Sequence, residues 1–123
     1  MTELRLSPLG HTWILDFDGT LVEHNGYKSG QDRFLPGARE FLAAIPDGDL
    51  VIILTAREHD ARAVTEAFLQ ENGVRYDCLM TGVPMGERIL LNDTKPSGLK
   101  TAFAFGFPRN SGPDLDIVID PTL

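Results

Sequence analysis

Short apolar runs alternate with helical patterns along this chain, and their order predicts an α/β fold. Thr12–Leu15 and Leu50–Leu54 have the apolar content of buried strands, and the unbroken aliphatic character of the second is typical of a parallel sheet. Apolar residues at helical spacing follow Pro36 as far as Pro46, and a second helical pattern covers Glu58–Asn72. This alternation predicts a doubly wound, mainly parallel sheet.

Later apolar runs predict further strands. They are Tyr76–Gly82, Arg88–Asp93, Thr101–Phe107 and Asp116–Asp120. No linker divides the chain, and its 123 residues with 42% apolar content suit one core rather than two. We therefore expect a single Rossmann-like α/β domain over residues 1–123.

Polar side chains follow three of the predicted strands at the points where those strands end. Asp16 and Asp18 follow the first strand, Thr55 ends the second, and Asp93 ends a later one with Lys95 two residues further on. Ligands bind beyond the carboxyl ends of parallel strands. We therefore expect carboxylates, a hydroxyl and a cation to meet at one edge of the sheet.

Two aspartates one residue apart repel each other unless something compensates their charge. Asp16 and Asp93 could share a hard divalent cation, and an all-oxygen ligand set suits Mg²⁺. Gly19 allows a sharp turn after Asp18, and the Thr20 hydroxyl can hydrogen-bond locally to hold that turn. Mg²⁺ is therefore the cofactor that the sequence predicts.

These residues together resemble a known family. Asp16-Phe17-Asp18-Gly19-Thr20 is similar to the first motif of the haloacid dehalogenase (HAD) superfamily in its phosphatase form. Thr55 resembles the second motif and Asp93 the acidic fourth motif, and the resemblance extends from Trp13 to about Gly112. The segment RILLNDTKPSGLKTAFAF also resembles small bacterial members of sugar-phosphate or capsule metabolism. The resemblance implies a Mg²⁺-dependent phosphomonoesterase.

The resemblance also implies a role for each matched residue. Asp16 would be the nucleophile that forms an aspartyl-phosphate, and Asp18 would protonate the leaving alkoxide and then activate water. Thr55 would hydrogen-bond a phosphoryl oxygen, and Asp93 would complete a metal site with Asp16 and the backbone carbonyl of Asp18. The residues expected to contact the substrate are Gly19, Thr20, Tyr27, Lys28, Ala56 and Arg57.

The third motif is where the chain departs from the family pattern. That motif normally supplies a Lys that balances the charge of nucleophile and phosphate, and Val83 stands at its position. Arg88 and Lys95 are the nearest substitutes. A strand that begins at Arg88 would hold that side chain roughly 16 Å from Asp93. We therefore expect Lys95 to supply the cation.

Members of the superfamily often carry a cap domain, inserted after the first motif or between the second and third. The first interval, Leu21–Leu35, holds only a polar loop, and Gly73–Val83 holds little beyond one strand. Neither interval can build a separate core. We therefore expect a capless protein whose specificity comes from the flap, Val22–Phe34, or from a neighbouring subunit of a homo-oligomer.

The composition of the chain limits the classes of partner that we expect and indicates a cellular compartment. The net charge is −7, so the chain lacks the basic face of a nucleic-acid-binding protein and the polybasic segment that binds membrane surfaces. Cys78 is the only cysteine, and the first residues lack the apolar core of a signal peptide. We expect a soluble, cytoplasmic protein that binds neither nucleic acid nor membrane.

A small phosphorylated metabolite, above all a sugar phosphate, is the leading substrate class. One alternative is a phosphotransferase that passes the phosphoryl group to an acceptor other than water. Another is a non-catalytic Mg²⁺- or phosphate-binding partner of a sugar-nucleotide enzyme. Val83 in place of the usual Lys favours that last interpretation, whereas the presence of both Asp16 and Asp18 favours catalysis.

Overall fold

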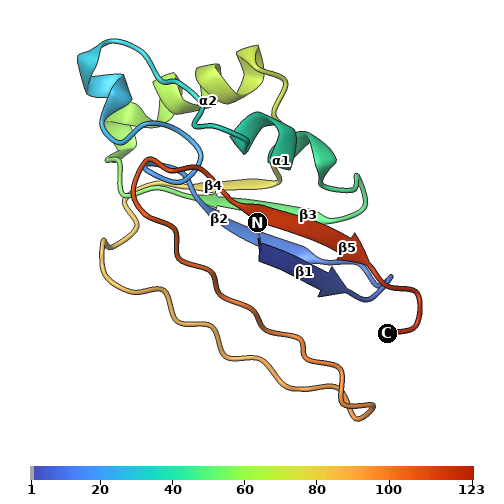
Figure 1. Cartoon of the computed structure of the whole chain (residues 1–123). Coiled ribbons are helices and arrows are strands. Elements are labelled where there is room, and N and C mark those ends of the chain that lie inside the picture. The colour runs from blue at the N-terminus through green and yellow to red at the C-terminus, as the bar shows by residue number, and fades with distance from the viewer. Residues whose placement is uncertain (1) are drawn as a thin grey trace.

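The computed structural model describes residues 2–123 and confirms the α/β class with a mainly parallel, Rossmann-like arrangement. Strands β2 (Thr12–Asp16), β3 (Leu50–Leu54) and β4 (Cys78–Met80) form a parallel sheet in the order β2-β3-β4. Strands β1 (Thr2–Leu6) and β5 (Leu115–Ile119) form a parallel pair beside it (Figure 1). The predicted strands near residues 12, 50, 78 and 116 are therefore confirmed.

Two α-helices follow the predicted patterns. Helix α1 (Ala38–Ala44) begins after Pro36, and helix α2 (Arg62–Glu71) continues from the short 3₁₀ helix η2 (His59–Ala61). Figure 1 shows both α-helices on the same side of the three-stranded sheet. Within residues 2–123, no helix has the length and apolar character needed to cross a bilayer.

The core lies between this sheet and the two helices. Val51 and Ile53 of β3 are fully buried, as is Leu69 of α2. Trp13 of β2 packs edge-on against Phe41 of α1, with ring centroids 5.7 Å apart. Burial of each such side chain stabilises the fold by about 1.5–3 kcal/mol. This packing fixes β2 and β3 relative to the helices.

The three strands of the central sheet end at the same level. In the register, Asp16 lies opposite Leu54, and Leu54 lies opposite Met80. The pairing continues one residue further, because the Phe17 amide donates to the Leu54 carbonyl and the Thr55 amide to the Met80 carbonyl. The loops that follow the strands therefore leave from one edge of the sheet, as the sequence predicted.

The flap is closed at its base and docked on a helix. The Leu35 amide donates to the Leu21 carbonyl at 2.9 Å, and Val22 bridges to Phe34. The Phe34 ring lies against Phe68 of α2, with centroids 4.9 Å apart. The flap contains only the short 3₁₀ helix η1 (Gly26–Ser29). The capless, single-domain architecture is therefore confirmed for the described residues.

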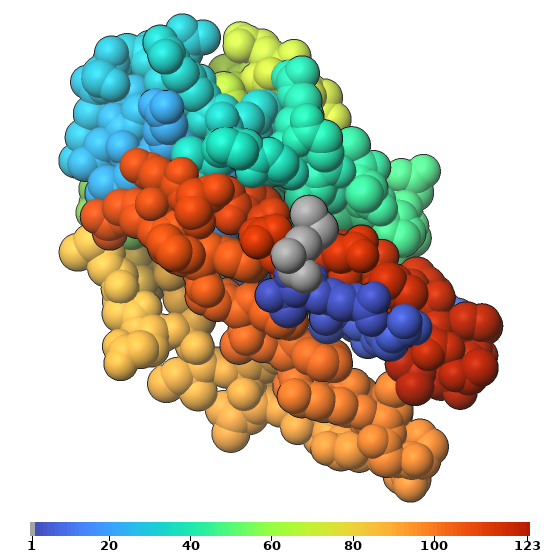
Figure 2. Space-filling model, in the orientation of Figure 1, coloured from blue at the N-terminus to red at the C-terminus, as the bar shows by residue number. Residues whose placement is uncertain are grey.

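Two predicted strands are wrong. Residues 88–93 and 101–107 belong to an extended segment between β4 and β5 that has no helix or strand. Figure 2 shows this yellow and orange segment projecting from the body of the molecule. Ile89 and Leu91 are 83% and 87% exposed. An apolar run forms a β-strand only where it pairs with another strand, and in this structure the segment does not pair with β4.

The N-terminal strand β1 was not predicted. Its side chains alternate, and only Leu4 and Leu6 face the core. The strand pairs with β5, more than a hundred residues away, in a register that sets Leu4 opposite Ile117. Five residues with two apolar positions give a weak signal, and the partner strand supplies the rest of the stabilisation.

Candidate active site

Asp16 stands at the carboxyl end of β2, and the turn after it is tightly held. The Thr20 hydroxyl donates to Asp16 Oδ2 at 2.9 Å. The Phe17 carbonyl accepts hydrogen bonds from the amides of residues 20–22. Gly19 adopts φ +83°, a left-handed conformation that favours glycine. The turn therefore orients the Asp16 carboxylate while leaving its side chain 37% exposed.

The electrostatic environment of Asp16 is mixed. Burial raises the pKa of Asp16 above its usual value, and the nearby Asp18 charge adds to this rise. The Thr20 hydrogen bond and the Arg88 cation oppose it without cancelling it. Such a perturbed carboxyl group at the carboxyl end of a parallel strand marks a candidate active site.

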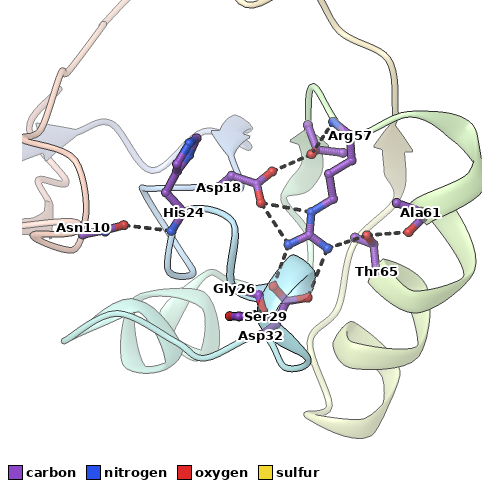
Figure 3. A network of polar contacts seen from close by, with 10 residues as sticks. Asp18, His24, Gly26, Ser29, Asp32, Arg57, Ala61, Thr65 and Asn110 are labelled. Atoms are coloured by element: carbon purple, nitrogen blue, oxygen red, sulfur yellow. Dashed lines mark hydrogen bonds and ion pairs between the residues drawn. The ribbon is translucent and has the colours of Figure 1, made fainter.

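Asp18 is held by three donors (Figure 3). The Thr55 hydroxyl donates to Asp18 Oδ2 at 2.6 Å. Arg57 approaches Asp18 Oδ1 through Nε at 3.0 Å and Nη2 at 2.9 Å. The sequence predicted that Asp16, Asp18 and Thr55 would meet, and the structure brings them together. The Thr55 hydroxyl, however, was expected to hydrogen-bond a phosphoryl oxygen, and in the structure it donates to Asp18 instead.

Arg57 is buried at the centre of this network. Its guanidinium binds Asp32 through Nη2 at 2.6 Å and through Nη1 at 3.1 Å, and Nη1 also donates to Thr65 at 2.8 Å. The Tyr27 ring covers the guanidinium at 3.9 Å, with the Phe17 ring 4.9 Å away. Burial alone lowers the pKa of Arg57, but the hydrogen bonds with Asp32 and Asp18 outweigh it and raise the pKa.

These contacts revise the expected substrate residues. The Arg57 side chain is only 1% exposed, and each of its nitrogens already has a protein partner. Arg57 is therefore not open to a phosphate, and Tyr27 packs on Arg57. Lys28 lies on the exposed flap, and Ala56 is half-buried. The sequence could not distinguish a ligand-binding arginine from one satisfied by a distant aspartate.

Asp93 and Lys95 lie elsewhere. Both are exposed on the extended segment, where the Asp93 carbonyl accepts a hydrogen bond from Thr101. Within residues 2–123, no three His, Cys, Asp or Glu side chains gather closely enough to hold a metal ion. The expected set of Asp16, Asp18 and Asp93 is therefore not assembled, because the strand that should carry Asp93 to the sheet edge does not form. Of the predicted metal ligands, Asp16 and Asp18 therefore lie at the sheet edge without Asp93.

Arg88, not Lys95, approaches Asp16. Arg88 Nη1 lies 3.6 Å from Asp16 Oδ1. The opposite expectation relied on a strand that would carry Arg88 away from the site. The chain instead stays close after β4, where the Val83 amide donates to the Thr55 carbonyl at 3.0 Å.

The turn before β5 supplies contacts that the sequence did not indicate. The Asn110 amide donates to the Gly19 carbonyl, and Asn110 Oδ1 accepts from the His24 amide, both at 2.9 Å. Arg109 Cγ lies 3.3 Å from the point where a Cβ on Gly19 would stand. The Pro and Gly residues that flank this segment could have predicted a turn. Nothing in the sequence predicted that the turn would lie against the loop of Gly19 and His24.

Comparison with known proteins gives a narrow set of similarities. No family model matches the chain. Over 87 residues it is 28% identical to a 2,3-bisphosphoglycerate-independent phosphoglycerate mutase of Pyropia yezoensis, a match that covers 71% of this chain and 16% of that enzyme.

Two solved structures of a Pnkp1/Rnl/Hen1 complex contain similar chains, one described as an RNA repair complex. Their TM-scores are 0.50 and 0.51, with 33% and 32% sequence identity over 63% and 67% of this chain. The aligned parts are 27% and 31% of those chains. This chain is thus similar to part of an enzyme and to parts of chains from a protein complex, and it spans less than a third of each.

Proposed function

We propose that this protein is a phosphomonoesterase that acts through an aspartyl-phosphate on Asp16. The observation that carries the proposal is the Asp16 carboxylate itself. It stands at the carboxyl end of a parallel strand, with Oδ2 fixed by Thr20, Oδ1 facing the Arg88 cation, and its side chain open to solvent. This is the arrangement that a nucleophilic carboxylate needs.

The first step would transfer the phosphoryl group to Asp16. An Asp16 oxygen attacks phosphorus as the ester P–O bond breaks. The leaving oxygen takes the electron pair of that bond and a proton from solvent water, which reaches the open site, and the alcohol departs. Arg88 lies close enough to Asp16 to offset the negative charge of an incoming phosphate. Two anions could otherwise approach each other only at a considerable cost in free energy.

The second step would hydrolyse the intermediate. Asp18 lies two residues beyond Asp16, and its side chain is 16% exposed, which leaves room for a small molecule such as water. A carboxylate in this position can accept a proton from water as that water attacks phosphorus. Thr55 then acts by orienting Asp18 rather than by binding the phosphate.

Mg²⁺ dependence remains a proposal from the resemblance to the HAD superfamily alone. The carboxylates of the described residues do not form a metal site, so no step above is assigned to a metal. Activity measured with added Mg²⁺ and with a chelator is the direct test of this dependence.

The leading substrate class is a small phosphate ester, with a phosphorylated sugar or related metabolite first. The likeness to a phosphoglycerate mutase supports phosphoryl chemistry on a small metabolite. An RNA-terminal phosphate is a second candidate, supported by the likeness to chains of an RNA repair complex and by the open, capless site. The net charge of −7 favours the small substrate, because a polynucleotide is normally held by a basic surface.

A panel of phosphate esters tests the proposal. We expect the protein to release inorganic phosphate from at least one sugar phosphate or from a 3′- or 5′-phosphorylated oligonucleotide. Asp16→Asn should abolish the release while the fold survives, and the exposed Asp47→Asn should match the unchanged protein. Release by Asp16→Asn at the normal rate would contradict the proposal. Phosphate binding without release by the unchanged protein would favour a non-catalytic binding module.

A further inference from the structure

We infer that Arg57 is a positioning residue that holds Asp18 for the hydrolysis of the aspartyl-phosphate, and that it ties this step to the flap. The inference rests on the proposed phosphatase function. It concerns a residue that the sequence suggested as a phosphate ligand and that the structure buries among protein partners.

Asp18 is arranged as an acceptor. Both of its carboxylate oxygens accept a hydrogen bond, Oδ2 from Thr55 and Oδ1 from Arg57 Nε, and Arg57 Nη2 forms an ion pair with Oδ1 at 2.9 Å. Neither oxygen donates a hydrogen bond within the described residues. A carboxyl group whose two oxygens both accept hydrogen bonds suits a general base. The geometry therefore favours the water-activating role of Asp18 over its role as a proton donor.

Arg57 is itself anchored from three sides. Asp32 of the flap binds both terminal nitrogens of the guanidinium, and Thr65 of α2 accepts a further bond from it. The centroid of the Tyr27 ring, also from the flap, lies 3.9 Å from Arg57 Cζ. Figure 3 shows Arg57 between Asp32 of the flap and Thr65 of α2. The planar fork of arginine contacts Asp32 through two nitrogens and Asp18 through Nε, a paired geometry that the compact ammonium of a lysine cannot reproduce.

When the leaving group is p-nitrophenolate, only the second chemical step needs a proton transfer that involves Asp18. In the first step an Asp16 oxygen bonds to phosphorus, and the phenolate leaves with the electron pair of the broken P–O bond, without needing a proton. In the second step the oxygen of water bonds to phosphorus as the Asp16–phosphorus bond breaks. Inorganic phosphate departs, and the proton of water passes to Asp18.

A variant that misplaces Asp18 should therefore slow only the second step. Slower hydrolysis of the intermediate lowers kcat and KM together and leaves kcat/KM nearly unchanged, because kcat/KM reports the first step. The phosphoenzyme then accumulates. A purely structural loss would lower the amount of active enzyme, so kcat and kcat/KM would fall by the same factor and KM would not move.

The test is the kinetics of Arg57→Lys with p-nitrophenyl phosphate, followed by acid quench and intact-mass measurement of phosphoenzyme. We expect kcat to fall at least about tenfold and at most by the roughly 10²–10⁴-fold that a positioned base contributes, with a burst of nitrophenolate and a stable phosphoenzyme fraction. Asp18→Asn should show the same separation of kcat from kcat/KM. Arg75→Lys is the matched control, since Arg75 is exposed and contacts Asp77 and the Pro46 carbonyl.

Asp32→Asn gives an independent answer if Arg57→Lys does not fold. It removes one charge from the anchor while leaving Arg57 and Asp18 in place, so we expect a smaller fall in kcat with the same preserved kcat/KM. The inference is overturned if the folded variants lose kcat and kcat/KM equally, or if they keep the normal kcat. If these results are obtained while Asp16→Asn is inactive, only the inference about Arg57 is wrong and the proposed function stands. If Asp16→Asn is active, the proposed function itself is wrong.

Discussion

Thr55 donates its hydroxyl hydrogen to Asp18 Oδ2 across 2.6 Å, joining the end of β3 to the loop that follows β2. The Thr55 side chain is fully buried, and its oxygen also accepts a hydrogen bond from the Arg57 amide at 3.1 Å. The hydroxyl thus contacts the candidate base rather than open solvent. Its effect on catalysis should pass through Asp18.

Thr55→Val should reduce kcat while the fold survives, because valine has nearly the same shape but no hydroxyl. A hydrogen bond to a charged group is worth about 1.5–3 kcal/mol, which corresponds to a fall of roughly ten- to hundredfold. Thr55→Ser keeps the donor and should stay close to the unchanged protein. Steady-state kinetics and thermal unfolding of both variants check this. An unchanged kcat in Thr55→Val would show that Asp18 does not need the bond.

Arg88→Ala should weaken phosphate binding more than Lys95→Ala does. Arg88 lies 3.6 Å from Asp16, whereas Lys95 is exposed on the extended segment. Loss of a charged donor should raise KM for a phosphate ester, or the inhibition constant of inorganic phosphate, by roughly ten- to hundredfold. A larger effect of Lys95→Ala would restore the order expected from the sequence and would imply that the segment rearranges when substrate binds.

Asp49 should support stability at neutral pH and lose that contribution in acid. Burial alone raises the pKa of Asp49, but hydrogen bonds from the Trp13 indole at 2.9 Å and from His11 outweigh it, so the pKa is lowered. Because the folded pKa lies below the unfolded value of about 3.9, the contribution is complete above that pH. It disappears as the pH falls through the folded pKa.

Urea unfolding of Asp49→Asn at several pH values measures this contribution. We expect the free energy of unfolding at pH 7 to fall by about 1–3 kcal/mol, and its decline below about pH 4 to be shallower than in the unchanged protein. Asp47→Asn, on the exposed loop two residues earlier, is the control and should change neither quantity. Parallel curves for Asp49→Asn and the unchanged protein below pH 4 would contradict the assignment.

The parts of the fold that the sequence predicted are those with strong local signals. Leu50–Leu54 is continuously aliphatic, and α1 is bounded by Pro36 and Pro46, so their structures depend little on distant partners. Residues 88–93 also contain an apolar run, Ile89–Leu91, yet they are exposed and extended because they pair with no other strand. Sheet formation depends on a partner strand, which a single apolar run does not identify.

The residues of the candidate site also differ in how far the sequence could predict their positions. Asp16 and Asp18 could be placed from their position after a strand, because the carboxyl ends of parallel strands share an edge. The pairing of Arg57 with Asp32 joins residues 25 positions apart through a loop, and a lone aspartate in a polar loop gives no sign of such a partner. The approach of Arg88 to Asp16 depends on the path of an irregular segment, which residue patterns do not determine.

Trapping of a phosphoenzyme shows whether Asp16 forms the covalent intermediate. The protein is mixed with a phosphate ester that it hydrolyses and is quenched in acid within the first turnover, and the modified residue is located by peptide mass spectrometry. We expect a phosphoryl group on Asp16 that forms before inorganic phosphate is released and that is absent in Asp16→Asn. Turnover of the ester with no phosphoryl group on Asp16, or with the group on another residue, would contradict this expectation.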